Sequence, residues 1–172
     1  MKTEALVPVE EYLRTTYDPD CDYVDGEVLE RNLGERDHST LQRDLIIFFG
    51  VRRKTWNVFV FPEQRVQVSP TRYRVPDICV YVGREPEDQI FRTPPFICIE
   101  ILSPEDRWKR IQQKIDDYLR FGVPYVFVLD PRDQRAWAYT KDGNTEIRDG
   151  VLRTENPSLA VPLSEIFGES DR

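Results

Sequence analysis

The sequence predicts an α/β (α+β-like) protein in which helices flank a mixed central β-sheet. The first observation is the order of the apolar patterns, which run helix, strands, helix, strand. That order favours a mixed sheet over an α/β fold in which helices and strands alternate regularly around a parallel sheet. The second observation is that two predicted strands, at 74–82 and 96–102, are apolar on both faces. Such strands are usually covered on both sides, here by helices.

Length and composition indicate one folded domain spanning 1–172. The chain has 172 residues, of which 40% are hydrophobic and 12% aromatic, enough to build a core. It contains no signal-peptide pattern and no run of eighteen apolar residues, so we expect a cytoplasmic protein without a membrane span. Its three cysteines form no CxxC pair, which argues against a disulfide framework and a structural zinc site.

The N-terminal part, 1–35, is expected to contain a short helix and a β-hairpin. The helix covers 4–16, and the hairpin covers 21–30 with Asp25-Gly26 as its turn. The next helix, 37–54, shows the spacing of one apolar face, which consists of Leu41, Leu45, Phe48 and Phe49.

The strands of the core follow, within a catalytic region predicted at 36–140. Residues 58–61 and 65–68 should be extended, with Pro62 marking an edge or bulge. The strands at 74–82 and 96–102 come next, joined by a polar connection.

A long helix at 105–121 is predicted after these strands, with Ser103 as its N-cap and Pro104 at its first position. Gly122 should end it. A strand at 125–129 and a hairpin of 134–140 with 145–154, turning at Asp142-Gly143, complete the pattern. The region 141–172 therefore closes the domain, ending in a short helix at 164–167.

Two carboxylates lie within the strongest strands. Asp77 stands at the start of 77–82 and Glu100 near the end of 96–102, so antiparallel pairing would bring them side by side. Buried carboxylates are costly without a cation, a donor or a proton. A magnesium ion would satisfy both, since it prefers carboxylate and water oxygens and often takes only one or two protein carboxylates.

Lys114 is the candidate third member of the site. It lies at the rim of an apolar arc on the helix 105–121, from which its ammonium could reach the sheet edge. The arc consists of Trp108, Ile111, Ile115, Tyr118 and Leu119. Each candidate also has an ordinary structural interpretation: Asp77 as a turn residue after proline, and Lys114 as a lysine that extends to solvent.

An ordered series of motifs resembles a known family. The motifs are FPEQRV at 61–66, RVPD at 74–77, IEILSP at 99–104, KIDDY at 114–118, GVPY at 122–125 and VLDP at 128–131. Together they are similar to the Uma-type restriction endonucleases, a branch of the PD-(D/E)XK nuclease superfamily. The similarity runs from the first helix to about residue 140.

The resemblance implies a restriction-endonuclease-like core that hydrolyses DNA phosphodiester bonds with Mg²⁺, or alternatively Mn²⁺. It assigns Asp77, Glu100 and Lys114 to catalysis and gives the metal to Asp77, Glu100 and Glu63, although Glu63 reads equally well as a solvated strand-edge residue. Leu102 stands where the superfamily signature has lysine, and the resemblance moves that role to Lys114. His38 matches a family position and could approach the site, but a histidine at a helix start is more often a cap or a surface group.

Two other functions stay open at this point. The net charge of −7 argues against a surface that grips nucleic acid. With Leu102 in the usual lysine position, the chain could be an inactive nuclease-fold module for nucleic-acid binding or assembly. A scaffold that does not bind nucleic acid is the third reading.

A homodimer suits an enzyme that cuts two strands, but the sequence does not show one.

Overall fold

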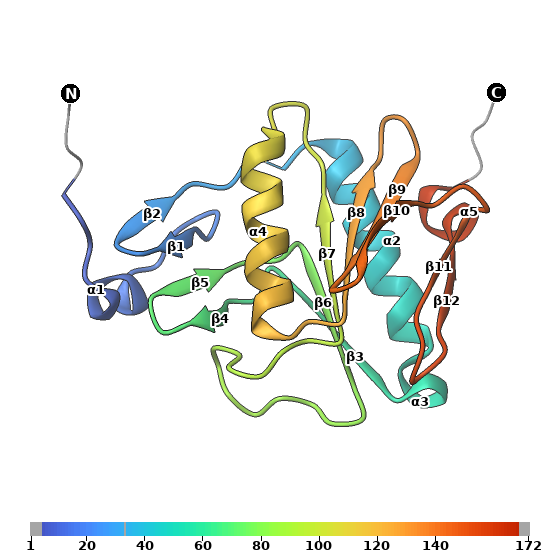
Figure 1. Ribbon diagram of the computed structural model, residues 1–172, viewed down its shortest axis with the longest axis horizontal. Coiled ribbons are helices and arrows are strands. Elements are labelled where there is room, and N and C mark those ends of the chain that lie inside the picture. Colours follow the sequence, from blue (N-terminus) through green and yellow to red (C-terminus); the bar gives the residue numbers. More distant parts are fainter. Residues whose placement is uncertain (1–4, 33, 169–172) are drawn as a thin grey trace.

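The computed structural model describes residues 5–32 and 34–168, and a six-stranded mixed sheet lies at its centre (Figure 1). Only β7 and β8 pair in parallel, and all other neighbours in the sheet are antiparallel. The strands follow the spatial order β10 (Gly143–Glu146), β9 (Arg135–Thr140), β8 (Tyr125–Asp130), β7 (Ile97–Ile101), β6 (Ile78–Val82) and β3 (Val58–Pro62).

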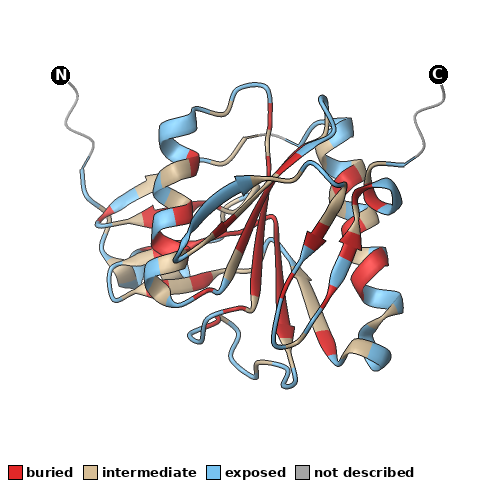
Figure 2. Ribbon diagram, turned by 45° about the vertical axis from the view of Figure 1, so that its right-hand side comes forward, coloured by how far each residue is buried: buried red, intermediate tan, exposed pale blue. Residues whose placement is uncertain are grey.

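Two long helices cover the two faces of this sheet, which confirms the predicted fold class. Helix α2 (Arg36–Val51) packs on one face against β3, β6 and β7, and α4 (Trp108–Phe121) contacts β8 on the other face. The three isoleucines of β7 join the core under α2, whereas Cys98 belongs to the core under α4. Figure 2 shows the resulting buried centre of the sheet. Glu100 therefore points to the α4 side, as strand alternation predicts.

A second sheet packs beside the first. Its order is β2 (Glu27–Leu29), β1 (Asp22–Val24), β5 (Arg72–Arg74) and β4 (Val66–Ser69), and β4 contacts α4. The Asp25-Gly26 turn is confirmed, with φ values of 50° and 101°. Helix α1 (Val9–Arg14) holds to this sheet through a tyrosine cluster of Tyr12, Tyr23 and Tyr73. The predicted helix 4–16 is confirmed over this shorter span, and its start at residue 4 lies outside the described residues.

The prediction of one continuous strand over 74–82 is wrong. The chain leaves the small sheet after β5 and enters the large sheet as β6, with Val75, Pro76 and Asp77 between them. Pro76 has no N–H for a ladder, and the N–H of Val75 donates to the Asp22 carboxylate at 2.9 Å instead of to a strand. This crossing sets Asp77 at the junction of the two sheets.

The predicted start of the long helix is also wrong. Helix α4 begins at Trp108, not at residue 105, and its N-cap position is Arg107. The Asp106 carboxylate accepts the N–H of Ser103 at 2.6 Å, and this local turn competes with a helical start. Trp108 is 52% exposed, so its place in the predicted apolar arc is wrong as well. The helix ends at Gly122 as predicted, with φ of 108°.

The remaining differences lie in connections. The predicted helix 37–54 ends earlier, and a short helix α3 (Arg53–Trp56) follows. The predicted closing hairpin of 134–140 with 145–154 is confirmed only for its first part, in which β9 pairs with β10. Its turn consists of Lys141 and Asp142, not of Asp142 and Gly143, because Gly143 already pairs with Thr140. Strand β11 (Val151–Arg153) pairs with β12 (Ala160–Pro162), and α5 (Leu163–Phe167) then packs on α2.

Candidate active site

The antiparallel register of β6 and β7 brings the two predicted carboxylates together. Ile78 pairs with Ile99, so Asp77 lies opposite Glu100 at the next step of the ladder. The N–H of Ile101 donates to Asp77 Oδ2 at 2.7 Å and fixes that carboxylate against β7. Both carboxylates are buried. The site therefore contains two carboxyl groups that the fold removes from bulk water.

Asp77 is surrounded by donors from the N-terminal half of the chain. Its Oδ1 accepts from Arg31 Nη2 at 2.7 Å and lies 3.2 Å from His38 Nε2. The amide of Gln42 donates to the Asp77 carbonyl at 3.0 Å. Burial by itself would raise the pKa of Asp77. The hydrogen bond with His38 and the charge of Arg31 outweigh that effect, so the pKa of Asp77 is lowered and the group is a carboxylate.

Glu100 has partners from α4. Lys114 Nζ lies 2.8 Å from Oε2, and the Tyr118 hydroxyl donates to Oε1 at 2.6 Å. Burial raises the pKa of Glu100 to about 7, with the nearby Asp77 charge adding to the rise and Lys114 opposing it. The two carboxyl groups of the site thus differ in how readily they lose a proton.

Lys114 reaches the site although it belongs to a helix rather than to the strand of Glu100. Burial would lower its pKa, but the charges of Asp22 and Glu100 raise it, so Lys114 is an ammonium. Asp22 Oδ2 lies 3.9 Å from Lys114 Nζ and 3.1 Å from Arg74 Nη1. Asp22 is therefore a third buried carboxylate beside the site, and it connects Lys114 to the small sheet.

Glu63 lies at the outer rim. Its side chain is 48% exposed, and Oε1 lies 3.6 Å from Arg31 Nη1. Its backbone adopts a left-handed φ of 49°, and its N–H donates to the Asp77 carbonyl at 3.3 Å. A non-glycine residue pays for that conformation, and such costs concentrate at functional sites.

These groups surround one cavity of about 110 Å³. Its wall holds more acids than permanent cations, which here are Arg31, Arg110 and Lys114. The acids of the wall are Asp22, Glu30, Glu63, Asp77, Glu100 and Asp106. The excess of negative charge suits a cation-binding site.

A magnesium ion fits this donor set with one condition. Within residues 5–32 and 34–168, no group of three or more histidine, cysteine, aspartate or glutamate side chains is arranged to hold a metal by itself. Magnesium needs only one or two carboxylates because it keeps several waters, and Asp77 and Glu100 supply them. The condition is that Arg31 leaves Asp77 Oδ1 and that Lys114 leaves direct contact with Glu100 Oε2 while it stays beside the site.

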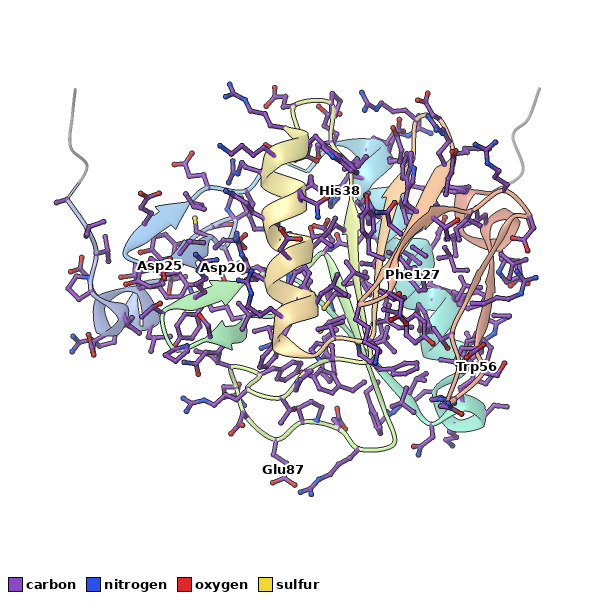
Figure 3. The ribbon with its side chains drawn as sticks, viewed as in Figure 1. Asp20, Asp25, His38, Trp56, Glu87 and Phe127 are labelled. Atoms are coloured by element: carbon purple, nitrogen blue, oxygen red, sulfur yellow. The ribbon has the colours of Figure 1, made fainter. Side chains whose placement is uncertain are left out.

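His38 departs from the interpretation that the sequence favoured. A cap or a surface group was expected more than a residue of the site, yet its Nε2 lies 3.2 Å from Asp77 Oδ1 and its side chain is only 13% exposed. Figure 3 shows it near the end of the sheet where β7 ends and α4 begins. One signal was present in the sequence: His38 and Gln42 are four residues apart, hence on one face of α2, and both contact Asp77. Arg31 and Asp22 carried no comparable signal.

Comparisons with known proteins concern the family and the fold of the chain. The family whose sequence model matches is Uma2, described as "Putative restriction endonuclease", over residues 9–166. Among solved structures, one similar chain is a "putative nuclease belonging to DUF820" from Anabaena variabilis ATCC 29413. It superposes with a TM-score of 0.79 at 22% identity, covering 94% of this chain and 97% of that one. At this identity the match shows the fold alone. No curated protein matches the chain.

Proposed function

The chain belongs to the Uma2 family, and from this premise we propose that it is a metal-dependent endonuclease that hydrolyses DNA phosphodiester bonds. One observation carries the proposal. Asp77 and Glu100 lie opposite each other at one end of the sheet, and the ammonium of Lys114 lies 2.8 Å from Glu100. These are the residue types that metal-dependent phosphodiester hydrolysis requires: oxygen ligands for a divalent ion and a fixed positive charge beside them.

Asp77 and Glu100 would hold Mg²⁺, or Mn²⁺ in its place, with Glu63 added directly or through water. Such an ion polarises a phosphoryl oxygen and makes a bound water a stronger acid at neutral pH. The rim position of Glu63 suits a water-mediated contact better than a direct one, because half of its side chain faces solvent.

The protein's own residues have three tasks in this proposal. Lys114 offsets negative charge that develops on the phosphate and orients the attacking water. Tyr118 and the N–H of Ile101 hold Glu100 and Asp77 in fixed orientations. His38 keeps a hydrogen bond on Asp77 and so limits its rotation.

The start of α4 is the part of the surface best suited to a nucleic-acid strand. Arg107, Trp108, Lys109 and Arg110 are consecutive and exposed, and Arg110 also lines the cavity. Basic side chains bind phosphates, and an exposed tryptophan can stack on an unpaired base. The net charge of −7 is therefore compatible with a local basic edge next to the acidic cavity.

The direct test is cleavage of supercoiled plasmid and of single-stranded oligonucleotides with Mg²⁺, with Mn²⁺ and with chelator. We expect metal-dependent nicking that falls about a hundredfold or more in Asp77→Asn and in Glu100→Gln. Asp116→Asn is the matched control, since Asp116 is an exposed acid of α4 that bonds Gln112 outside the cavity. Cleavage unaffected by the two site substitutions would reject this active site.

An inactive nucleic-acid-binding or assembly module is the second candidate. The observation that favours it is Leu102 in the position where the superfamily has lysine, together with the full set of protein partners on Glu100. Salt-sensitive DNA binding without cleavage by either metal would select this candidate.

The proposal extends to the setting of the protein. In the described part of the chain, no helix is long and apolar enough to cross a bilayer. Cys21, Cys79 and Cys98 are all buried free thiols, which suits a reducing compartment, and we place the protein in the cytoplasm. Cutting both strands of a duplex would require two sites, and we propose a homodimer for that reaction.

A further inference from the structure

We propose that Arg31 is an internal counter-cation that holds the metal-binding carboxylates in the metal-free protein and leaves Asp77 when the divalent ion binds. The inference rests on the proposed function, since it concerns the same cavity. Neither the sequence motifs nor the family match assigns a role to Arg31.

The position of the guanidinium is the first observation. Arg31 Nη2 lies 2.7 Å from Asp77 Oδ1, and Nη1 lies 3.6 Å from Glu63 Oε1. Arg31 therefore contacts two of the three carboxylates that would serve the metal. An arginine and a divalent ion cannot both take the same carboxylate oxygen at contact distance, because their charges repel.

The bonding of the guanidinium is the second observation. The Arg31 side chain is only 10% exposed. Its Nη1 is a buried nitrogen without a hydrogen-bond partner among the described residues. A buried donor left unpaired has a cost in free energy. Arg31 is thus held by charge more than by a complete set of hydrogen bonds, as expected of a group that can be exchanged.

The backbone on either side of Arg31 is held in place, so that the exchange needs only its side chain to move. Residues 30–32 follow β2 and belong to no helix or strand. Two contacts tie this segment to the start of α4: Arg110 Nη2 donates to the Glu30 carbonyl at 2.8 Å, and Asn32 Nδ2 donates to Asp106 at 2.6 Å. The two neighbours of Arg31 are therefore anchored, while its side chain extends to Asp77 and Glu63. A change of side-chain rotamer would release Asp77 without moving the sheet.

The exchange has a definite consequence for metal binding. The free energy of metal binding is then the difference between two interaction free energies, that of the metal with the carboxylates and that of Arg31 with the same carboxylates. Removing the guanidinium charge should therefore tighten binding, although Arg31 lies in the site itself. A residue that supports the metal site only by packing would have the opposite effect.

The test is titration of the purified protein with Mn²⁺ by calorimetry. In Arg31→Gln, which keeps an N–H donor for Asp77 but no charge, we expect binding about tenfold tighter or more. Arg31→Lys keeps the charge and should stay within about threefold of the unsubstituted protein. Arg107→Gln is the control for general charge near the cavity, because Arg107 is exposed at the start of α4 and does not line the cavity. Its effect should be clearly smaller than that of Arg31→Gln.

The outcomes separate this inference from the proposed function. Tighter binding in Arg31→Gln supports the exchange, including the case in which only that variant binds Mn²⁺ measurably. Equal or weaker binding in a folded Arg31→Gln overturns the exchange but leaves a metal-dependent nuclease intact. No binding by any of the four proteins overturns both. If Arg31→Gln does not fold, a more than tenfold change in either direction in Arg31→Lys contradicts the inference.

Discussion

Glu100 is the residue whose environment gives the clearest pH dependence. Its pKa is raised from 4.5 to about 7, with burial as the largest cause. An acid with a higher pKa in the folded state holds its proton more tightly there than in the unfolded chain. Its contribution to stability is therefore complete below pH 4.5 and is lost as pH rises through about 7.

We predict that the unfolding free energy of the unsubstituted protein falls between pH 5 and pH 8 relative to that of Glu100→Gln. The relative loss should approach about 1.4 kcal/mol per pH unit at most, because one proton is involved. Urea unfolding of both proteins, without added metal, measures the difference at each pH. A difference that does not change with pH would contradict the assigned environment of Glu100.

The sequence predicted the site residues that follow from a local pattern and missed those that depend on the tertiary fold. Asp77 and Glu100 stand out because each interrupts an apolar strand, and Lys114 because it lies at the edge of a helical face. The structure brings all three to one cavity, while their catalytic roles stay predictions. Arg31 and Asp22 reach the site from the N-terminal hairpin region. Nothing in the sequence around them indicates that they come close to Asp77 and Lys114.

Helix α4 is the element on which the site depends most, and a buried ion pair fastens it to the small sheet. Asp117 accepts from Arg72 and Arg74, each at 2.7 Å, and its side chain is almost fully buried. We predict that Asp117→Asn lowers the unfolding free energy by about 3 kcal/mol, because it removes one of the two carboxylates that balance the buried guanidinium of Arg74 and leaves only Asp22. Its neighbour provides the control. Asp116→Asn, on the exposed side, should change the unfolding free energy by less than about 0.5 kcal/mol in the same urea titration. Equal effects would contradict the role given to Asp117.

The first turn of α4 is predicted to contact the substrate. Trp108→Ala should weaken binding of a short single-stranded DNA by about 1–3 kcal/mol if the indole stacks on a base. Lys109→Gln should instead lower the slope of log affinity against log salt by about one, as a lost phosphate contact does. Fluorescence titration over a range of salt concentrations separates the two effects. Val51→Ala, at a 72% exposed site on α2, is the control. Unchanged binding in both variants of α4 would place the nucleic acid elsewhere.

Elements with a strong apolar period were predicted well, and their boundaries were wrong where side chains bond the backbone. The buried face of α2 and the strands at the centre of the sheet follow from spacing alone. The break between β5 and β6 depends on the Asp22 carboxylate that takes the N–H of Val75. The late start of α4 depends in the same way on Asp106. The contact of Asp22 with Val75 is a tertiary contact, and that of Asp106 with Ser103 is a local turn. The spacing of apolar residues indicates neither of them.

For the whole molecule, the site is the place where the two sheets and both long helices meet. The large sheet supplies Glu100, the junction of the two sheets Asp77, the small sheet Asp22, and the helices His38 and Lys114. Figure 1 shows the small sheet and α1 on one side and the C-terminal strands with α5 on the other. The candidate site therefore depends on contacts between distant parts of the chain, and no single segment contains it.

A crystal structure of the protein with bound Mn²⁺, in which the anomalous signal locates the ion, would decide whether Asp77 and Glu100 hold a metal together. We expect one anomalous peak within coordination distance of both carboxylates. An occupied Mn²⁺ site elsewhere, with these two carboxylates still bonded only to protein groups at saturating metal, would contradict it.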